Sequence, residues 1–372
     1  MITALAAVLL GGLVWYAPWR EQKFPASLGE AIVSVYTARS EKAIENAYAY
    51  LEEGDGRFDV SARTIIAQET INTSTTTEDI AVAIALWKEN FASARTQYAK
   101  AVAVKQIARA LFMTNAPYRD VFHDDFFKSL RVKDDPRRSL ENLIRYSISL
   151  HPTAGAYLLL ARQEADSILE SMQAGSSEPL DDSPAAAARL RESAAKIGEY
   201  VDEADLLTGE DILRAESTLY APLIGPSLAY WRGHALAAAA HVDPSYLAEA
   251  ERSYNSVYVA SAIETEGEEL PALERLKAET EFAYARALLR VEGSARVGDI
   301  RVHLERFIAF LVAHPERHEI PYANIAFARS GAELQGPDTR QQLRARRYRE
   351  YVQFANLSPQ FKTFLEAQGW KL

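Results

Sequence analysis

Residues 228–261 have the sequence LAYWRGHALAAAAHVDPSYLAEAERSYNSVYVAS, and this stretch decides the fold that we expect. Its first half carries glycine and alanine one helical turn apart, and its second half carries aromatic residues such as Tyr254. A short polar segment around Pro244 separates the two halves. Small side chains let two helices approach closely, and alanine is the best helix former. The stretch therefore predicts a helical hairpin, in which two helices are joined by a short turn.

Two later stretches repeat this pattern of a small-residue helix, a polar turn and an aromatic-bearing helix. They are 281–316, EFAYARALLRVEGSARVGDIRVHLERFIAFLVAHPE, and 321–359, PYANIAFARSGAELQGPDTRQQLRARRYREYVQFANLSP. The three units resemble tetratricopeptide (TPR) repeats, and the matching residues are Gly233, Ala235, Tyr254, Ala285, Ala287, Leu288, Phe307, Pro315, Ala326, Ala328, Tyr348 and Pro359. The unit starts are not spaced by the regular repeat length of about 34 residues, so the resemblance is to a degenerate TPR-like array.

The resemblance implies an all-α fold in which antiparallel helical hairpins stack into an α-α superhelix, or solenoid. It covers residues 185–372 well and residues 27–172 only by general helical-hairpin character. A helical bundle is the alternative. The resemblance also implies an adaptor or assembly factor rather than an enzyme, with a concave surface that binds protein segments. In such repeats the first helix of each pair makes the groove contacts, and the candidate residues there are Tyr230, His234, Asn324 and Arg329.

Helix-start patterns also recur in the first half of the chain. Residues 27–30, SLGE, form a capping box that predicts one helix carrying apolar residues from Ile32 to Leu51. A second capping box at residues 75–78 precedes apolar residues spaced alternately four and three apart between Ile80 and Ala101. Such a heptad seam predicts one long helix packed against a neighbour.

Proline-containing caps mark the next helices and a candidate domain boundary. Asp135 followed by Pro136 is a typical N-cap and first helical residue, and Ser183 followed by Pro184 repeats that pattern. A further helix is expected from about Ala154 to Met172. The segment GSSEPLDDSP between these helices is the best linker in the chain. The predicted organisation is an anchor at 1–20, a helical-hairpin region at 27–174, a linker at 175–184 and a TPR-like region at 185–372.

The first twenty residues predict attachment to a membrane. Residues 2–19, ITALAAVLLGGLVWYAPW, hold no charge, and at 1.5 Å per residue they span roughly 27 Å, enough for a bilayer core. Trp15, Tyr16 and Trp19 cluster at the end of the run, where an interfacial aromatic belt is expected. No small-x-small cleavage site follows, so we expect an uncleaved single transmembrane helix.

The orientation of this anchor rests on weaker features. Arg20 and Lys23 follow the run and by themselves favour a cytoplasmic body. The run begins directly after Met1, as it would if the true start lay upstream, and on that basis we expect the body on the extracytoplasmic side. A buried N-terminal helix is the alternative, because Gly11 and Gly12 weaken the span.

Composition supports helix and excludes several kinds of site. Of 372 residues 62 are alanine, whereas glycine (17) and proline (15) are below average usage. The chain contains no cysteine, which excludes disulfides, zinc–thiolate sites, iron–sulfur clusters and cysteine nucleophiles. The sequence also lacks phosphate-binding glycine loops, the HEXXH zinc motif and the G-x-S-x-G nucleophile elbow. We therefore predict no enzyme, no cofactor and no metal site.

Charge is distributed unevenly along the chain. The formal net charge is −10, which makes nucleic-acid binding a poor expectation. Residues 164–211 hold 13 acidic and 3 basic side chains, whereas residues 338–372 hold 7 basic and 3 acidic ones. Arg340, Arg344 and Arg347 share one helical face and are candidate contacts for an acidic protein partner or for the acidic middle of another copy.

The sequence as a whole predicts a membrane-tethered TPR-like scaffold that binds protein partners and positions a complex at the membrane. The identity of these partners does not follow from the sequence. Two alternatives remain open at this point. One is a self-associating structural membrane protein, and the other is an all-α enzyme or cofactor binder with a pocket in residues 75–172.

Overall fold

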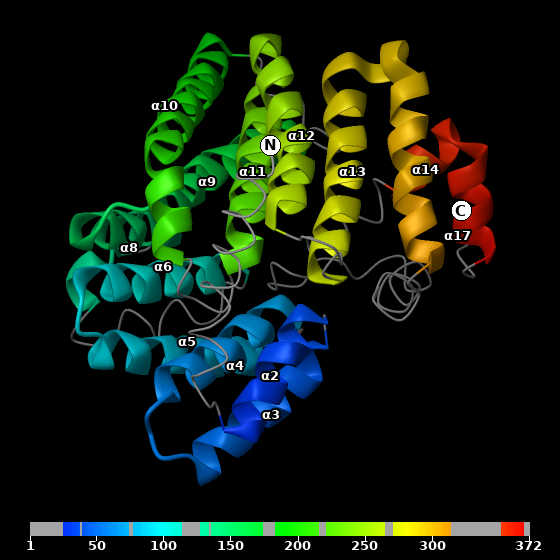
Figure 1. The fold of residues 1–372 in the computed structure, drawn as a ribbon. Coiled ribbons are helices and arrows are strands. Elements are labelled where there is room, and N and C mark those ends of the chain that lie inside the picture. Colours follow the sequence, from blue (N-terminus) through cyan, green and yellow to red (C-terminus); the bar gives the residue numbers. More distant parts are fainter. Residues whose placement is uncertain are drawn as a thin grey trace, which may run out of the picture.

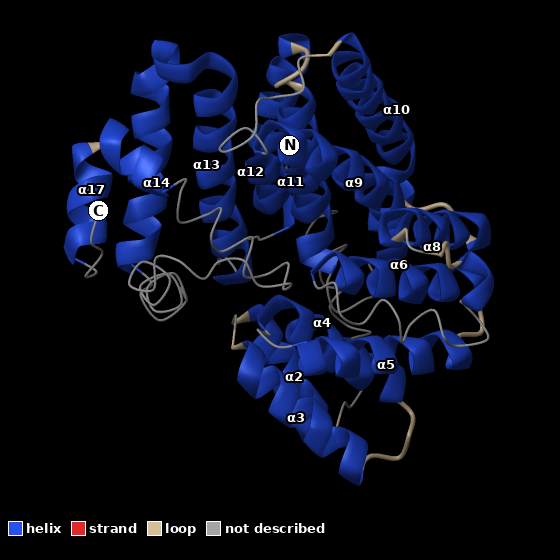
Figure 2. Ribbon diagram, turned by 180° about the vertical axis from the view of Figure 1, so that it is seen from behind, coloured by secondary structure: helices blue, strands red, loops and turns tan. Residues whose placement is uncertain are grey.

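The computed structural model describes most of the chain, and every regular element in the described part is helical, with no strand (Figure 2). The described residues are 25–37, 39–73, 77–113, 127–133, 135–173, 183–215, 221–264, 271–313 and 351–367. The all-α fold class is therefore confirmed for this part of the protein.

Each helix from α2 to α14 packs against the next one along the chain (Figure 1). The helices are α2 Ala26–Tyr36, α3 Ser40–Glu53, α4 Asp59–Thr73, α5 Thr77–Ser93, α6 Gln97–Met113, α8 Pro136–Leu150, α9 Ala154–Gln173, α10 Pro184–Ala215, α11 Ala221–Ala239, α12 Leu247–Glu264, α13 Pro271–Glu292, α14 Val297–Ala313 and α17 Pro359–Ala367. Contacts also join α9 to α11 and α11 to α13, which places these three helices in one row.

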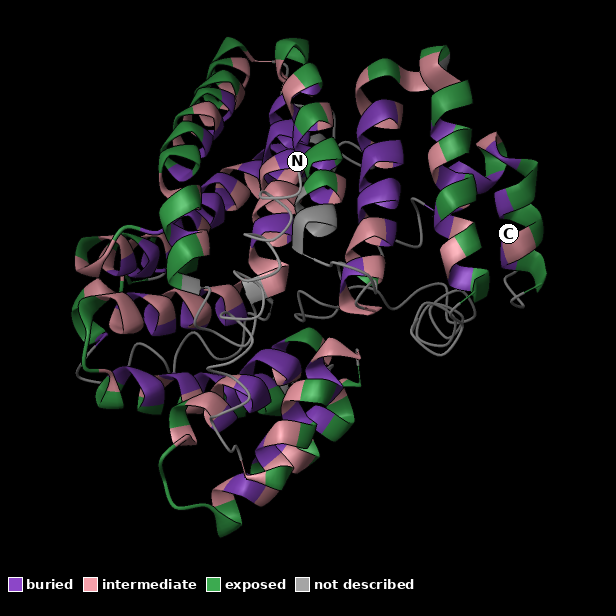
Figure 3. Ribbon diagram, in the orientation of Figure 1, coloured by how far each residue is buried: buried purple, intermediate pink, exposed green. Residues whose placement is uncertain are grey.

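The apolar core runs along the chain in three clusters. The first joins α2, α3 and α4, the second extends from α4 to α9, and the third extends from α9 to α17. Figure 3 shows buried residues interleaved with exposed ones on most helices, whereas the middle turns of α13 are buried nearly all round. Because α4 and α9 each contribute to two clusters, neighbouring helices bury their apolar faces in succession rather than around a single centre.

The hairpin predicted at 228–261 is confirmed. Helices α11 and α12 pack together, and Asp243 in the turn accepts a hydrogen bond at Oδ1 from the backbone N–H of Ser245 at 3.0 Å. A Cβ atom added at Gly233 would lie 2.7 Å from the ring carbons of Tyr254. Glycine at this position therefore allows α11 to approach the tyrosine on α12, as the small-residue pattern predicts.

The second unit is also a hairpin, formed by α13 and α14. Its pattern residues Ala285, Ala287, Leu288 and Phe307 are all buried. Most of the third unit, residues 321–350, lies outside the described residues, and so do the start of the linker and the first 24 residues.

Local capping predictions are confirmed for two helices and wrong for one. Asp135 Oδ1 accepts from the backbone N–H of Arg138 at 2.8 Å at the start of α8, and Ser183 Oγ accepts from Ala186 at 3.2 Å at the start of α10. Helix α2 instead starts at Ala26 without a side-chain cap, so the capping box over residues 27–30 is not formed. Proline 25 precedes the helix directly and sets its start.

Two predicted long helices are helical hairpins in the structure. The helix expected from Ile32 to Leu51 is divided into α2 and α3. The heptad seam is divided at residues 94–96, where Thr96 Oγ1 accepts from the backbone N–H of Ala99 at 3.1 Å and caps α6. The apolar spacing continues across this break because α5 and α6 turn their apolar faces to the same cluster. Periodicity alone did not reveal the reversal of direction.

The predicted boundary at 175–184 remains a prediction. Residues 174–182 lie outside the described part of the chain, and the helices that flank them, α9 and α10, pack against each other in the third cluster. The membrane anchor also lies outside the described residues. Among the helices that are described, none combines the length and the apolar character needed to cross a bilayer.

Candidate functional site

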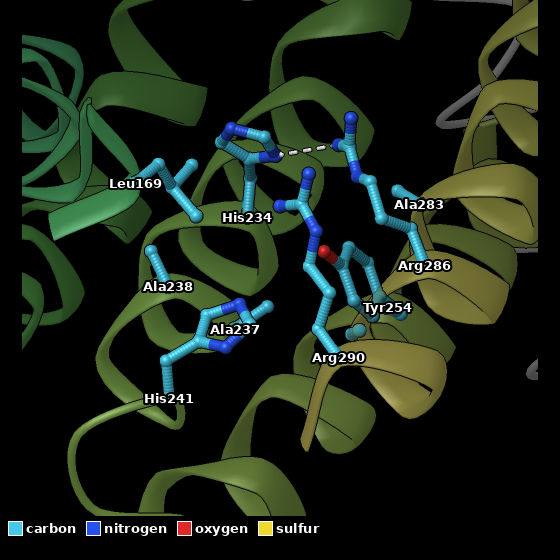
Figure 4. Close-up of a pocket in the computed structure, with 10 residues that line it drawn as sticks. Leu169, His234, Ala237, Ala238, His241, Tyr254, Ala283, Arg286 and Arg290 are labelled. Carbon is cyan, nitrogen blue, oxygen red and sulfur yellow. Dashed lines mark hydrogen bonds between the residues drawn. The ribbon is translucent and has the colours of Figure 1, made fainter. Parts of the chain in front are cut away.

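A small hollow that is open to solvent lies where α9, α11, α12 and α13 meet (Figure 4). Helix α11 supplies His234 and two alanines, the turn after it supplies His241, and α13 supplies two arginines and two alanines. The lining residues are Leu169, His234, Ala237, Ala238, His241, Tyr254, Ala283, Arg286, Ala287 and Arg290. The hollow is thus built mainly by the first helices of the two best-matching repeat units.

Helical spacing explains why these side chains face one another. Arg286 and Arg290 are one turn apart on α13 and so lie on one face of that helix. His234 is on α11, and His241 lies in the turn directly after this helix, where its backbone N–H donates to the carbonyl of Ala238 at 3.2 Å. The alanines between them are buried and leave room beside the longer side chains. Figure 4 shows both arginines extending from α13 towards α11.

One hydrogen bond orients an imidazole in the hollow. Arg286 Nη2 lies 3.2 Å from His234 Nδ1. Because a guanidinium group can only donate hydrogen bonds, Nδ1 of His234 is the acceptor. Tyr230 stacks on His234, with ring centroids 6.3 Å apart and an interplanar angle of 21°. The imidazole of His234 therefore lies between an aromatic ring and an arginine.

The imidazole of His241 is neutral near pH 7. Burial lowers the pKa of His241 from 6.5 to about 4, and the positive charges of Arg290 and Arg286 act in the same direction. Burial raises the pKa of the Tyr254 hydroxyl, so the phenol keeps its proton. The charged groups among the lining residues are the two guanidinium groups, and these residues include no carboxylate. The hollow is a site of positive charge in a chain whose net charge is −10.

This chemistry favours an anion over a metal ion. Two imidazoles are potential metal ligands, but the neighbouring guanidinium groups repel a cation. Among the described residues there is no group of three or more histidine, aspartate or glutamate side chains close enough to hold a metal. Guanidinium groups are instead well suited to carboxylates and phosphates, to which they donate paired hydrogen bonds.

The opposite side of α13 carries a different polar cluster. Glu281 is buried, and its carboxylate accepts from His303 Nδ1 at 2.5 Å and lies 3.4 Å from Arg306 Nη1, both on α14. Although burial opposes its ionisation, the hydrogen bonds from His303 and Tyr258 hold the pKa of Glu281 below its usual value. Helix α13 therefore pairs its acid with the His303 imidazole and the Arg306 guanidinium on one side and presents arginines to the hollow on the other.

Another balanced cluster lies where α6, α9 and α10 meet. Asp211 on α10 is 7% exposed, and its Oδ2 accepts from the backbone N–H of Ala154 at 2.7 Å, which caps α9. Burial raises the pKa of Asp211, whereas Lys105 and the amides of Ala154 and Gly155 oppose that rise. A Cβ on Gly155 would lie 3.1 Å from Lys105 Nζ, so the ammonium group also lies at the start of α9. The acid and the base compensate each other within the fold.

Of the predicted site residues, the structure describes two. Tyr230 and His234 lie together on α11, and His234 lines the hollow. The other five lie outside the described residues: Asn324, Arg329, Arg340, Arg344 and Arg347. The hollow receives only Leu169 from residues 75–172, the segment in which the alternative enzyme or cofactor pocket was expected.

The sequence analysis missed His241, Arg286 and Arg290 as site residues. A pattern that points to the arginines is present in the sequence, since Ala283, Arg286, Ala287 and Arg290 occupy one face of the second repeat unit's first helix. Basic side chains among small residues on that face are expected to meet the preceding helix. No comparable pattern marks His241, which follows a run of alanines.

Comparison with protein-family models, curated proteins and solved structures gives no match to this chain. The functional argument therefore depends on the chemistry and position of the hollow, because fold class alone does not specify function.

Proposed function

We propose that this protein is a membrane-tethered, TPR-like solenoid scaffold that binds a segment of a partner protein across the row formed by α9, α11 and α13. The observation that carries the proposal is the hollow on the first helices of two consecutive hairpins, which is lined by arginine, histidine and aromatic side chains. In a solenoid of helical pairs this is the layer that offers an extended binding surface. The role is binding rather than catalysis.

Three further features support the scaffold. The helices pack in chain order, the core continues from one helix pair to the next, and Gly233 and Tyr254 make the close contact expected of the first repeat unit. Arginine, tyrosine and tryptophan are the residues that most often dominate protein–protein binding. Tyr230 packs edge-on against Trp231 with ring centroids 5.1 Å apart, next to the arginine-lined hollow.

Site-specific crosslinking tests the binding face. A photo-crosslinking amino acid is placed at Tyr230 on α11 and, as the matched control, at Val259 on α12, where the native side chain is 62% exposed. In native membranes we expect a discrete protein adduct from position 230 and none of that size from position 259. Equal adducts from both positions would contradict the assignment of the face, and no adduct from either would contradict the scaffold.

The tether and its orientation need separate measurements. Removal of residues 1–20 is expected to release the protein from the membrane fraction. Alkaline phosphatase fused after Leu372 is expected to be active, because we propose that the body is extracytoplasmic. An inactive but intact fusion would place the body on the cytoplasmic side, and a deletion variant that stays in the membrane would remove the anchor from the proposal.

A further inference from the structure

We propose that the outer face of α10 binds a second copy of this chain, through the basic segment at residues 128–138 of that copy. This contact goes beyond the scaffold, since neither surface lines the hollow and no foreign protein is needed. Both surfaces lie in the described part of the chain, apart from residue 134, and they carry opposite charges.

Helix α10 carries the two most exposed large apolar side chains among the described residues. Leu206 is 80% exposed and Leu213 is 66% exposed. They are seven residues apart, which is two helical turns, so they lie on the same face of α10. The opposite face packs against α9 and α11 and carries the buried Ile197, Val201 and Ala204. Figure 1 shows α10 at the edge of the array, so the face with the leucines points away from its neighbours.

Acidic side chains surround the two leucines. Residues 199–213 hold six acidic side chains and no basic one. Three of the six are engaged within the fold, namely Asp205 with Arg232, Glu210 with Arg214 and Asp211 at the start of α9. The other three are exposed and have no ion-pair partner in the described structure: Glu199, Asp202 and Glu203. Uncompensated acids beside exposed leucines suit a partner surface that is basic and partly apolar.

The chain itself carries such a surface. Residues 128–138, KSLRVKDDPRR, hold five basic and two acidic side chains in a protein of net charge −10. Arg137 pairs with Glu164 on α9, and the carboxylate of Asp135 caps α8. The other four cations are exposed and have no ion-pair partner among the described residues: Lys128, Arg131, Lys133 and Arg138.

Two further features of the basic segment favour an acidic partner. It leads into the N-terminus of α8, where the helix dipole disfavours cations, so acids from another chain would stabilise it. Leu130 and Val132, which are only partly buried, lie between the cations and offer apolar area to the leucines of α10. The segment therefore matches the outer face of α10 in both charge and polarity.

Charge also decides how two copies can meet. Two α10 faces repel each other, and two basic segments do the same, so neither surface pairs with its own kind. Within one chain, no ion pair joins the exposed acids of α10 to the exposed cations of the basic segment in the described structure. The contact is therefore expected between the α10 face of one copy and the basic segment of another. Because each copy carries both surfaces, two copies related by a twofold axis can make the contact twice.

Sedimentation velocity of the purified full-length protein in detergent tests the contact. We expect the wild type to self-associate, and less so at high salt, because salt screens exposed charges. The double substitution Asp202→Arg and Glu203→Arg is expected to weaken the association at least tenfold. Glu52→Arg with Glu53→Arg is the matched control, since it makes the same change of charge at exposed positions on α3, and it is expected to weaken the association less than twofold.

A charge exchange tests the pairing of the two surfaces directly. Arg131→Glu with Lys133→Glu reverses the basic segment and is also expected to weaken the association at least tenfold. An equal mixture of this variant with the α10 double variant is expected to associate again, because each reversed surface then meets the opposite charge on the other protein. General instability of either variant would not be corrected by mixing.

The leucines give an independent measurement. Leu206→Ser is expected to weaken the association severalfold, because the contact removes this side chain from water. Val259→Ser on α12, where the native side chain is 62% exposed, is the control and is expected to have no effect.

Several outcomes would overturn the proposal. They are a wild type that stays monomeric at high concentration, an assembly that neither double reversal weakens, equal losses in the α10 variant and the α3 control, or a mixture that stays monomeric. Circular dichroism of each variant shows whether its helices are retained. Adducts from position 230 in a protein that stays monomeric would retain the scaffold and reject the contact between copies.

Discussion

At the junction of α6, α9 and α10 a buried carboxylate lies near the half-buried ammonium group of Lys105, whereas in the hollow between α11 and α13 two guanidinium groups lie near two imidazoles. Both regions place charge between helices. The carboxylate of Asp211 accepts a hydrogen bond from the start of α9 and interacts electrostatically with the ammonium group of Lys105. The residues that line the hollow supply no such acid.

The difference separates a structural cluster from a candidate binding site. A buried charge is tolerated when it is paired and hydrogen-bonded, so the junction stabilises the packing of three helices. The lining of the hollow combines arginine, histidine and tyrosine side chains that are partly open to solvent. Mutations in the junction are therefore expected to affect stability first, and mutations in the hollow are expected to affect binding of the proposed partner first.

The largest expected effect is that of Asp211→Ala. The substitution leaves Lys105 without its buried counter-charge and the amides at the start of α9 without their acceptor, at a cost of about 3 kcal/mol in the free energy of unfolding. Urea unfolding followed by circular dichroism measures this change.

The adjacent residue offers a matched control for the junction. Glu210 pairs with Arg214 at 2.6 Å, and its side chain is 49% exposed. Because exposed ion pairs contribute little, Glu210→Ala is expected to change the free energy of unfolding by less than about 1 kcal/mol. Equal effects of the two substitutions would show that the junction is not the balanced structural cluster described above.

The next largest effect is expected for Gly233→Ala in the wall of the hollow. The new Cβ would lie 2.7 Å from the Tyr254 ring, and relieving this overlap is expected to lower stability by about 2 kcal/mol and to displace the ring towards the hollow. Gly209→Ala in α10 is the control, because no atom lies within 4 Å of its added Cβ.

Gly209→Ala is expected to stabilise the protein by about 0.5–1 kcal/mol through helix propensity. Thermal unfolding is expected to show a lower melting temperature for Gly233→Ala and a higher one for Gly209→Ala than for the wild type. A stabilising Gly233→Ala would contradict the close packing of α11 and α12 and, with it, the strongest structural correspondence to the repeat pattern.

A smaller effect is expected in the pH dependence of the free energy of unfolding, and it arises from His241 in the hollow. The pKa of His241 is 6.5 in an unfolded chain and about 4 in the folded protein, so only the unfolded chain binds this proton between those values. The stability contributed by neutral His241 is present above pH 6.5 and is lost as the pH falls towards 4, by up to about 1.4 kcal/mol per pH unit.

His241→Gln removes this contribution and is expected to flatten the pH dependence of unfolding between pH 6.5 and pH 5. Parallel stability curves for the two proteins would contradict the buried, neutral state of His241.

The smallest expected effect concerns a residue between the two regions. Arg162 on α9 lies over the ring of Trp231 at 4.4 Å and over that of Phe112 at 5.4 Å, which connects α6, α9 and α11. Its Nε is buried and has no hydrogen-bond partner among the described contacts, so the cation–π contribution is partly offset. Arg162→Met is expected to lower stability by less than about 1 kcal/mol, as measured by urea unfolding. A decrease of more than about 2 kcal/mol in the free energy of unfolding would show that Arg162 belongs to the structural cluster at the junction of α6, α9 and α10.

Several helices could be predicted from the sequence because the residues that set their ends lie close together in the chain. Asp135 and Ser183 cap the helices that begin at the next residue, each through its own side chain and a backbone amide three residues ahead. The helix at 154–172 and the hairpin at 228–261 also follow from nearby residues. The break at 94–96 was missed because an apolar spacing of four and three is preserved when an antiparallel hairpin turns both helices to one cluster.

The candidate site could be predicted only in part. His234 and Tyr230 followed from the expectation that first helices carry binding residues; His234 lines the hollow, and Tyr230 stacks on it. Arg286 and Arg290 were missed because their role depends on which face of α13 meets α11. Surface arginines on many helices share the same spacing without forming a site.

The sequence by itself determined that the described chain is helical, where several helices begin and why α11 can approach α12, because propensity, capping and side-chain size act over a few residues. Only the tertiary structure decided which charged and titratable side chains meet. Asp211 meets Lys105 and the start of α9, and His241 meets Arg286 and Arg290, through contacts between helices that are distant in sequence. Such electrostatic pairing depends on the packing of whole helices, and no local pattern encodes it.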